Sequence, residues 1–85
     1  MNRELGIVMD PIGSINIKKD STFAMMLAAQ RRGWRLWYME PGDLSLRPGQ
    51  CLARMREVEV TDSAQSWFRL GAEALRPLAS LPAVL

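Results

Sequence analysis

The sequence predicts an α/β fold that begins with a strand–helix–strand unit. An apolar run over 5–9 is followed by Asp-Pro and is typical of a strand covered on both faces of a parallel sheet. Strong helix formers fill 22–32, and a second apolar, aromatic-rich run covers 34–40. A strand, a helix and a second strand in this order predict one βαβ unit with parallel strands.

The boundaries of these elements follow from local signals. Pro11 disfavours helix at the preceding residue and ends the first strand. Asp20 or Ser21 is a suitable N-cap for a helix over 21–32. Gly33 is suited to end that helix, because glycine adopts the left-handed conformation without steric cost.

The second half of the chain predicts a β-hairpin and less regular structure. Alternating segments on both sides of Pro-Gly predict a hairpin over 44–56, and the alternation continues to residue 61. The run 66–70 is compatible with a strand or a short helix. We expect 72–80 to be a loop or a frayed helix, because Pro77 interrupts it.

The end of the sequence is apolar and resembles the opening of a buried strand. No polar residue follows Ala83-Val84-Leu85. We therefore expect the domain to be truncated at its C-terminus.

Composition restricts the class of protein. The chain has 85 residues, enough for one small domain or part of one, and its net charge of +2 comes from mixed signs, which does not favour nucleic-acid binding. The apolar run near the N-terminus is too short for a signal peptide or a membrane span. Cys51 is the single cysteine and histidine is absent, so we expect no internal disulfide, no metal ligation by this chain, and a cytoplasmic location.

Several conspicuous residues are expected to be structural. The spacing of the methionines and aromatics predicts core packing, and Cys51 is expected to be a small half-buried residue. The charged residues between 54 and 59 predict a solvated strand face with cross-strand pairs. These residues are Met25, Met26, Trp34, Trp37 and Tyr38 for the core, and Arg54, Arg56, Glu57 and Glu59 for the strand face.

The segment 10–21 is the best candidate for a binding site. It follows a strand and precedes a helix, where free backbone amides at 21–23 would favour an anion, and Lys18 and Lys19 add positive charge. The alternative is that both lysines are solvated and that Asp20 or Ser21 only caps the helix. The glycines match neither a dinucleotide-binding fingerprint nor a phosphate-binding loop.

Three strings in the sequence carry a family resemblance. LGIVMDPIxSINIKKDSTFAMM, AQRRGW and YMEPGDLSL closely resemble the N-terminal domain of bacterial glutathione synthetase, an ATP-grasp ligase. The resemblance is strongest over 5–26 and 30–44 and weakens after residue 49. It implies a three-layer, Rossmann-like pre-ATP-grasp domain whose sheet is mostly parallel with a hairpin.

The resemblance also implies a function. Members join γ-glutamylcysteine to glycine with ATP and Mg²⁺ through an acyl phosphate, and they commonly assemble as dimers or tetramers. Residues 1–85 would be a single, incomplete substrate-side domain that lacks the ATP-grasp domain, has no catalytic or metal-binding residues, and binds no cofactor alone. We therefore expect the isolated chain to be inactive.

The residues expected to contact γ-glutamylcysteine lie in the loop 13–21. They are Asn16, Lys18, Lys19 and Ser21. Pro82 departs from the family pattern, which often has an acidic residue there, and should delay the start of the last strand. The alternative function is a small stand-alone α/β module for interaction or anion binding, without catalysis.

Overall fold

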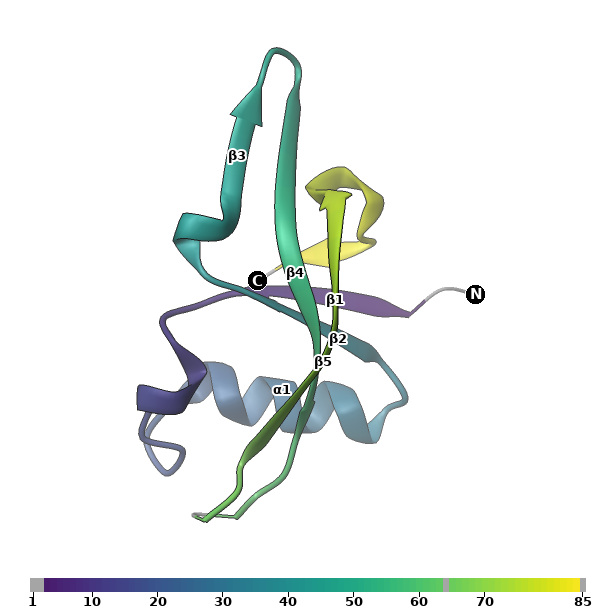
Figure 1. Ribbon diagram of the computed structural model, residues 1–85. Helices are drawn as coiled ribbons and strands as arrows, with labels where there is room; N and C mark the ends of the chain where they lie inside the picture. The colour runs from purple at the N-terminus through teal and green to yellow at the C-terminus, as the bar shows by residue number, and fades with distance from the viewer. Residues whose placement is uncertain (1–2, 64, 85) are drawn as a thin grey trace.

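The computed structural model describes residues 3–63 and 65–84, which form a curled, mixed β-sheet with one α-helix packed on it (Figure 1). The strands are β1 (Glu4–Val8), β2 (Arg35–Met39), β3 (Leu44–Arg47), β4 (Gln50–Val60), β5 (Phe68–Pro77) and β6 (Ala83–Val84). The helix is α1 (Ser21–Arg31), and three short 3₁₀ helices are η1 (Ile12–Ser14), η2 (Pro41–Asp43) and η3 (Leu78–Ser80).

The sheet combines parallel and antiparallel pairings. The order of the hydrogen-bonded strands is β3-β4-β2-β1-β6. The remaining strand, β5, lies outside this order and pairs with β4. β1 is parallel to β2 and to β6, whereas β4 is antiparallel to β2, β3 and β5. The α/β class, the strand–helix–strand unit and the hairpin over 44–56 are confirmed. The sheet is mixed rather than mostly parallel, because short turns join β2, β3 and β4 and a parallel neighbour needs a longer crossover.

Helix α1 begins and ends where the sequence indicates. The side chain of Asp20 accepts a hydrogen bond from the Phe23 amide at 2.8 Å, so Asp20 is the N-cap. Arg32 is the C-cap residue, and Gly33 follows with a φ of +84°. Phe23 and Met26 are buried against the sheet.

The sheet has two apolar faces of different size. The larger core cluster, here called the helix face, lies between the sheet and α1, and its buried residues are Leu5, Ile7, Met9, Ile12, Phe23, Met26, Leu36, Tyr38, Val58 and Val60. The opposite face, here called the second face, contains Trp37, Met39, Ala53, Met55 and Leu81. Leu44 and Leu78 pack at the edge of this smaller cluster. In the described residues, the layer over the second face consists of η3 and Leu81 rather than a second α-helix.

A buried carboxylate lies on the second face. Glu4 is 4% exposed, and its carboxylate accepts hydrogen bonds from Trp37 Nε1 at 2.7 Å and from both terminal nitrogens of Arg76, at 2.8 and 3.3 Å. The Arg76 guanidinium also lies 5.3 Å from the centroid of the Trp37 ring. These contacts connect β1, β2 and β5, which are distant in sequence.

The C-terminal third of the chain differs from the prediction. The expected loop or frayed helix over 72–80 is wrong, because β5 runs to Pro77 and η3 follows. β4 presents a long edge, and β5 pairs along it from Val60↔Phe68 to Leu52↔Pro77. The ambiguous run 66–70 contains the start of β5, and β6 begins after Pro82, as predicted. Leu85, the last residue of the predicted strand opening, lies outside the described residues.

Core predictions are largely confirmed. Trp37, Tyr38 and Met26 are buried and Cys51 is half-buried. Met25, in contrast, is 49% exposed, because it lies on the outward side of α1.

Candidate functional site

The segment between β1 and α1 is anchored at the carboxyl end of β1. The Met9 amide donates to the Met39 carbonyl at 3.0 Å, and the Ile12 amide donates to the Tyr38 hydroxyl at 3.1 Å. The Trp67 indole donates to the Ile12 carbonyl at 2.9 Å. The first part of this segment is therefore held by residues from β2 and from the approach to β5.

The four predicted contact residues share the second part of this segment. The Asn16 side-chain oxygen accepts from the Lys18 amide at 3.1 Å, and the Asn16 carbonyl accepts from the Lys19 amide at 3.0 Å. Asn16 thus forms the turn that presents the two lysines. All four side chains, Asn16, Lys18, Lys19 and Ser21, are exposed, and none lines a described cavity.

The helix N-terminus is less open than the sequence suggests. The expectation of three free amides is wrong for Phe23, whose amide donates to the Asp20 carboxylate. Asp20 also places a negative charge beside any incoming anion. The positive charge at this end of the segment therefore comes mainly from Lys18 and Lys19.

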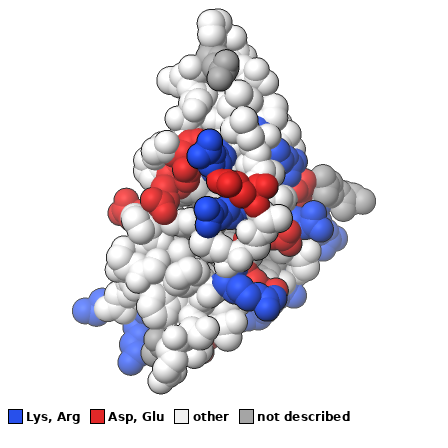
Figure 2. Space-filling model, viewed as in Figure 1, with Lys and Arg blue, Asp and Glu red and all other residues white. Residues whose placement is uncertain are grey.

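A cavity of about 420 Å³, here called the carboxyl-edge cavity, lies beside the first part of the segment. Its walls come from η1, from the residues after β2, and from β4 and β5. The lining residues are Pro11, Ile12, Gly13, Tyr38, Glu40, Asp43, Arg54, Arg56, Phe68, Leu70 and Glu73. Acidic and basic side chains gather over the middle of the molecule on the face that Figure 2 shows.

Sequence reasoning did not assign the charged residues of β4 to a cavity. Arg54 Nε lies 3.6 Å from Glu73 Oε1 on β5, so the predicted cross-strand pairing is confirmed for Arg54. Alternation along β4 places Arg56 on the same side as Arg54. The partner strand β5 was not predicted at these positions, and the sequence therefore carried no signal that they face a shared hollow.

Tyr38 lines this cavity and contacts Glu40, one of its acidic residues. Its hydroxyl donates to the Glu40 carboxylate and accepts from the Ile12 amide. Burial, together with the hydrogen bond to Glu40, raises the pKa of Tyr38 to about 12. The phenol is therefore neutral at physiological pH and acts as a fixed hydrogen-bond donor to Glu40.

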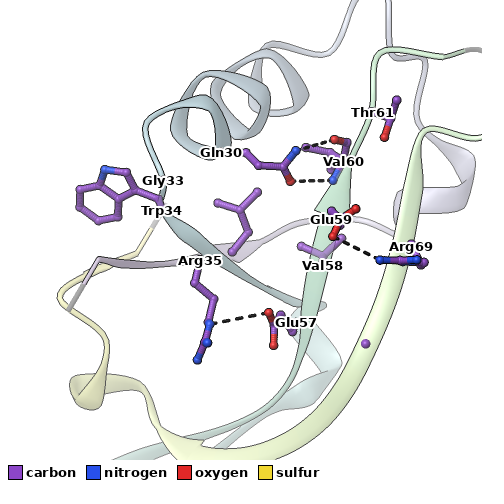
Figure 3. A pocket seen from close by; sticks show the side chains of 12 residues that line it. Gln30, Gly33, Trp34, Arg35, Glu57, Val58, Glu59, Val60, Thr61 and Arg69 are labelled. Carbon is purple, nitrogen blue, oxygen red and sulfur yellow. Dashed lines mark hydrogen bonds and ion pairs between the residues drawn. The ribbon is translucent and has the colours of Figure 1, made fainter.

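A second cavity, of about 620 Å³, lies at the opposite end of the sheet, beside the start of β2 (Figure 3). Its charged side chains already have partners. Arg35 lies 3.6 Å from Glu57, and Arg69 lies 3.3 Å from Glu59. The side chain of Gln30 is also engaged, because it donates to the Val60 carbonyl at 2.7 Å and accepts from the Val60 amide at 2.9 Å. This cavity offers fewer free polar groups than the carboxyl-edge cavity.

Across 3–63 and 65–84, no group of three or more His, Cys, Asp and Glu side chains is placed to hold a metal ion. Within the same ranges, no helix is both long and apolar enough to cross a bilayer, since α1 has 11 residues.

The fold and the anchored segment define an α/β domain with its candidate binding edge at the carboxyl ends of β1 and β2. Residues 4–85 match the family described as the N-terminal domain of prokaryotic glutathione synthetase, and the chain belongs to this family. The resemblance found in the sequence is therefore confirmed.

Curated relatives agree with this assignment. The chain is 57% identical to a glutathione synthetase of Yersinia pestis over 82 residues, which are 96% of this chain and 26% of that protein. It is 53% identical over 85 residues to one of Pseudomonas aeruginosa, covering 100% of this chain and 27% of the relative. A third, from Escherichia coli O157:H7, is 54% identical over 82 residues, covering 96% and 26%. The chain thus spans about a quarter of the length of these relatives.

Proposed function

We propose that this chain is the substrate-side domain of a glutathione synthetase, an ATP-dependent ligase that joins γ-glutamylcysteine to glycine. The observation that carries this proposal is the match to the family over 4–85, together with identity above one half to relatives named glutathione synthetase. The candidate binding edge of the fold is compatible with a substrate role.

The proposed reaction has two steps. The cysteinyl carboxylate of γ-glutamylcysteine attacks the γ-phosphorus of ATP and forms an acyl phosphate, with ADP as the leaving group. The glycine amine then attacks the acyl carbon, loses a proton, and displaces inorganic phosphate. Mg²⁺ would neutralise the phosphate oxygens in the first step. We propose that the groups holding ATP and Mg²⁺ belong to the three quarters of the relatives that this chain does not match, and that the chain alone binds neither.

We propose that the segment 13–21 contributes to binding of γ-glutamylcysteine. Lys18 and Lys19 are exposed beside each other and would attract the substrate carboxylates, whereas Asn16 and Ser21 would supply neutral hydrogen-bonding groups. The turn at Asn16 supports this role, because it fixes the backbone of both lysines before substrate arrives. Their contribution is to position and bind substrate rather than to transfer protons.

A graft tests both parts of the proposal. This chain would replace the matching quarter of the Yersinia pestis relative, and glutathione formation would be measured. We expect an active enzyme in which Lys18→Ala or Lys19→Ala raises the KM for γ-glutamylcysteine roughly tenfold, with kcat little changed. Arg31→Ala, which removes an exposed cation at the other end of α1, is the matched control.

The outcomes separate the two parts. A folded graft without ligase activity would contradict the proposed enzyme. An active graft whose KM is the same with either lysine removed would exclude the segment from the substrate site.

Two further properties belong to this proposal. The whole enzyme would work in the cytoplasm, in agreement with the unpaired thiol of Cys51. It would assemble as a dimer or tetramer, as the resemblance implies, and sedimentation of the grafted enzyme would measure that state.

A further inference from the structure

The carboxyl-edge cavity contains opposite charges that do not fully neutralise one another. Arg56 lies opposite Tyr38 on β2 and opposite Glu73 on β5. Within 3–63 and 65–84, Arg56 forms no ion pair, because Glu73 is engaged with Arg54 instead. A guanidinium with its hydrogen-bond donors free therefore faces a hollow of about 420 Å³.

The acidic side of the cavity is fixed in place. The Glu40 amide donates to the Asp43 carboxylate at 2.9 Å, and the Asp43 amide donates to the Glu40 carbonyl at 2.8 Å. The Tyr38 hydroxyl also donates a hydrogen bond to the Glu40 carboxylate. These bonds order both carboxylates without supplying a cation, so little conformational entropy would be lost when a cationic group binds between them.

The wall between the two charged sides is apolar. Ile12 is buried, and Phe68 and Leu70 are half-buried. The Trp67 indole donates a hydrogen bond to the Ile12 carbonyl. The centroid of the Trp67 ring lies 5.8 Å from the centroid of the Phe68 ring. The contacts of Trp67 fix this apolar wall, so a small apolar group can pack against it.

We propose that this cavity binds a free α-amino acid with an apolar side chain. The carboxylate of the ligand would accept hydrogen bonds from Arg56, its ammonium group would lie at Glu40 and Asp43, and its side chain would pack on Phe68 and Leu70. A simple anion would leave the two carboxylates without a counter-charge, and a simple cation would leave Arg56 without one, whereas a zwitterion satisfies both. The site goes beyond the proposed function, because none of the four proposed contact residues in 13–21 lines it.

Nuclear magnetic resonance titration of the full chain tests this site directly. The probes are L-leucine, acetate and methylammonium, and the readout is the shift of backbone amide signals. We expect L-leucine to shift the amides of Gly13, Arg56 and Leu70. Acetate and methylammonium should need at least tenfold higher concentrations for the same shifts.

Two variants test the charged ends separately. Arg56→Gln should weaken L-leucine binding at least tenfold, whereas the matched control Arg69→Gln, on an exposed arginine outside the cavity, should leave it unchanged. Glu40→Gln keeps a hydrogen-bond acceptor for Tyr38 but removes the charge. It should therefore abolish the preference for L-leucine over acetate.

Three results would overturn the inference. They are the absence of shifts around the cavity with L-leucine, an equal response to acetate, and an equal loss of binding in Arg69→Gln and Arg56→Gln. None of these results depends on ligase activity, so this inference and the proposed function can fail independently.

Discussion

The two faces of the sheet are closed in different ways. On the helix face, Phe23 and Met26 of α1 pack with eight buried residues from the rest of the chain, of which only Tyr38 carries a side-chain oxygen or nitrogen. On the second face, five buried residues are accompanied by the buried carboxylate of Glu4 and by Arg76. The chain has one α-helix in its described residues, so the second face is closed by η3, by Leu81 and by directed polar contacts.

Distant strands of this sheet are therefore joined in two ways: by the burial of apolar side chains, and by hydrogen bonds and an ion pair to a buried carboxylate. The second way is here called polar anchoring. Apolar packing on the helix face tolerates small adjustments, because dispersion and water exclusion are not directional. The contacts of Glu4 are directional, and removal of one partner leaves a charge in a poorly solvated place. On the second face, packing is also close, since a Cβ at Gly6 would lie 2.5 Å from Leu81 Cδ1.

The largest effect is expected on the helix face. Phe23→Ala removes a ring that is 1% exposed and should lower the free energy of unfolding by about 4 kcal/mol, because it loses apolar burial and leaves a cavity. Urea unfolding measures this loss. Met25→Ala, on the exposed side of the same helix, should change stability by less than about 0.5 kcal/mol. Equal losses in both variants would show that α1 does not close this face by burial.

A somewhat smaller effect is expected on the second face. Arg76→Ala should lower the free energy of unfolding by about 3 kcal/mol, because it removes the ion pair and the hydrogen bonds that Arg76 forms with the buried carboxylate of Glu4. Arg69→Ala on the same strand breaks only an exposed pair and should cost less than about 1 kcal/mol. If Arg76→Ala were no more harmful than Arg69→Ala, the polar anchoring of this face would be refuted.

The ionisation of Tyr38 gives a further test of burial on the helix face. The ordinary pKa of tyrosine is 10.0, and burial raises the pKa of Tyr38 to about 12, so the folded chain holds this proton more tightly than the unfolded chain. The stabilisation is complete below pH 10 and is lost as the pH rises through about 12. Tyr38 is the single tyrosine, so phenolate absorbance reports it alone. A midpoint at the ordinary value in the folded chain would contradict its burial.

The smallest effect is expected at the end of α1. Asp20→Ala removes the side-chain acceptor for the Phe23 amide and should cost about 1 kcal/mol. Asp20→Asn retains a capping oxygen and should cost a few tenths of a kcal/mol at most. Thermal unfolding of the two variants measures the difference, and a loss in Asp20→Asn as large as in Asp20→Ala would assign the effect to charge instead of capping.

The first half of the fold could be predicted because its signals are local. Pro11, Asp20 and Gly33 fix the ends of the first strand and of α1 through backbone sterics and capping, which need no distant partner. The second half could not be predicted to the same depth. Residues 72–77 have weak strand propensity, and they form a strand because β4 offers them an edge and Glu4 binds Arg76.

The candidate site, like the fold, could be predicted only where its signals are local. The exposed position of Lys18 and Lys19 follows from a polar segment between a strand and a helix. The carboxyl-edge cavity needs Arg56, Glu40 and Phe68, which come from three separate elements. The register of β2, β4 and β5 brings these residues together, and it depends on pairing between distant strands, which local signals along the chain do not reveal.

The pairing of Gln30 with Val60 affects how the sheet can associate with other chains. β4 extends beyond the first residue of β2, so the peptide groups of Val60 would otherwise face outward without a strand beside them. The primary amide of Gln30 occupies both groups in the way that a neighbouring strand would. A foreign β-strand therefore finds no free donor or acceptor at Val60, and the helix protects this stretch of sheet edge against intermolecular strand addition.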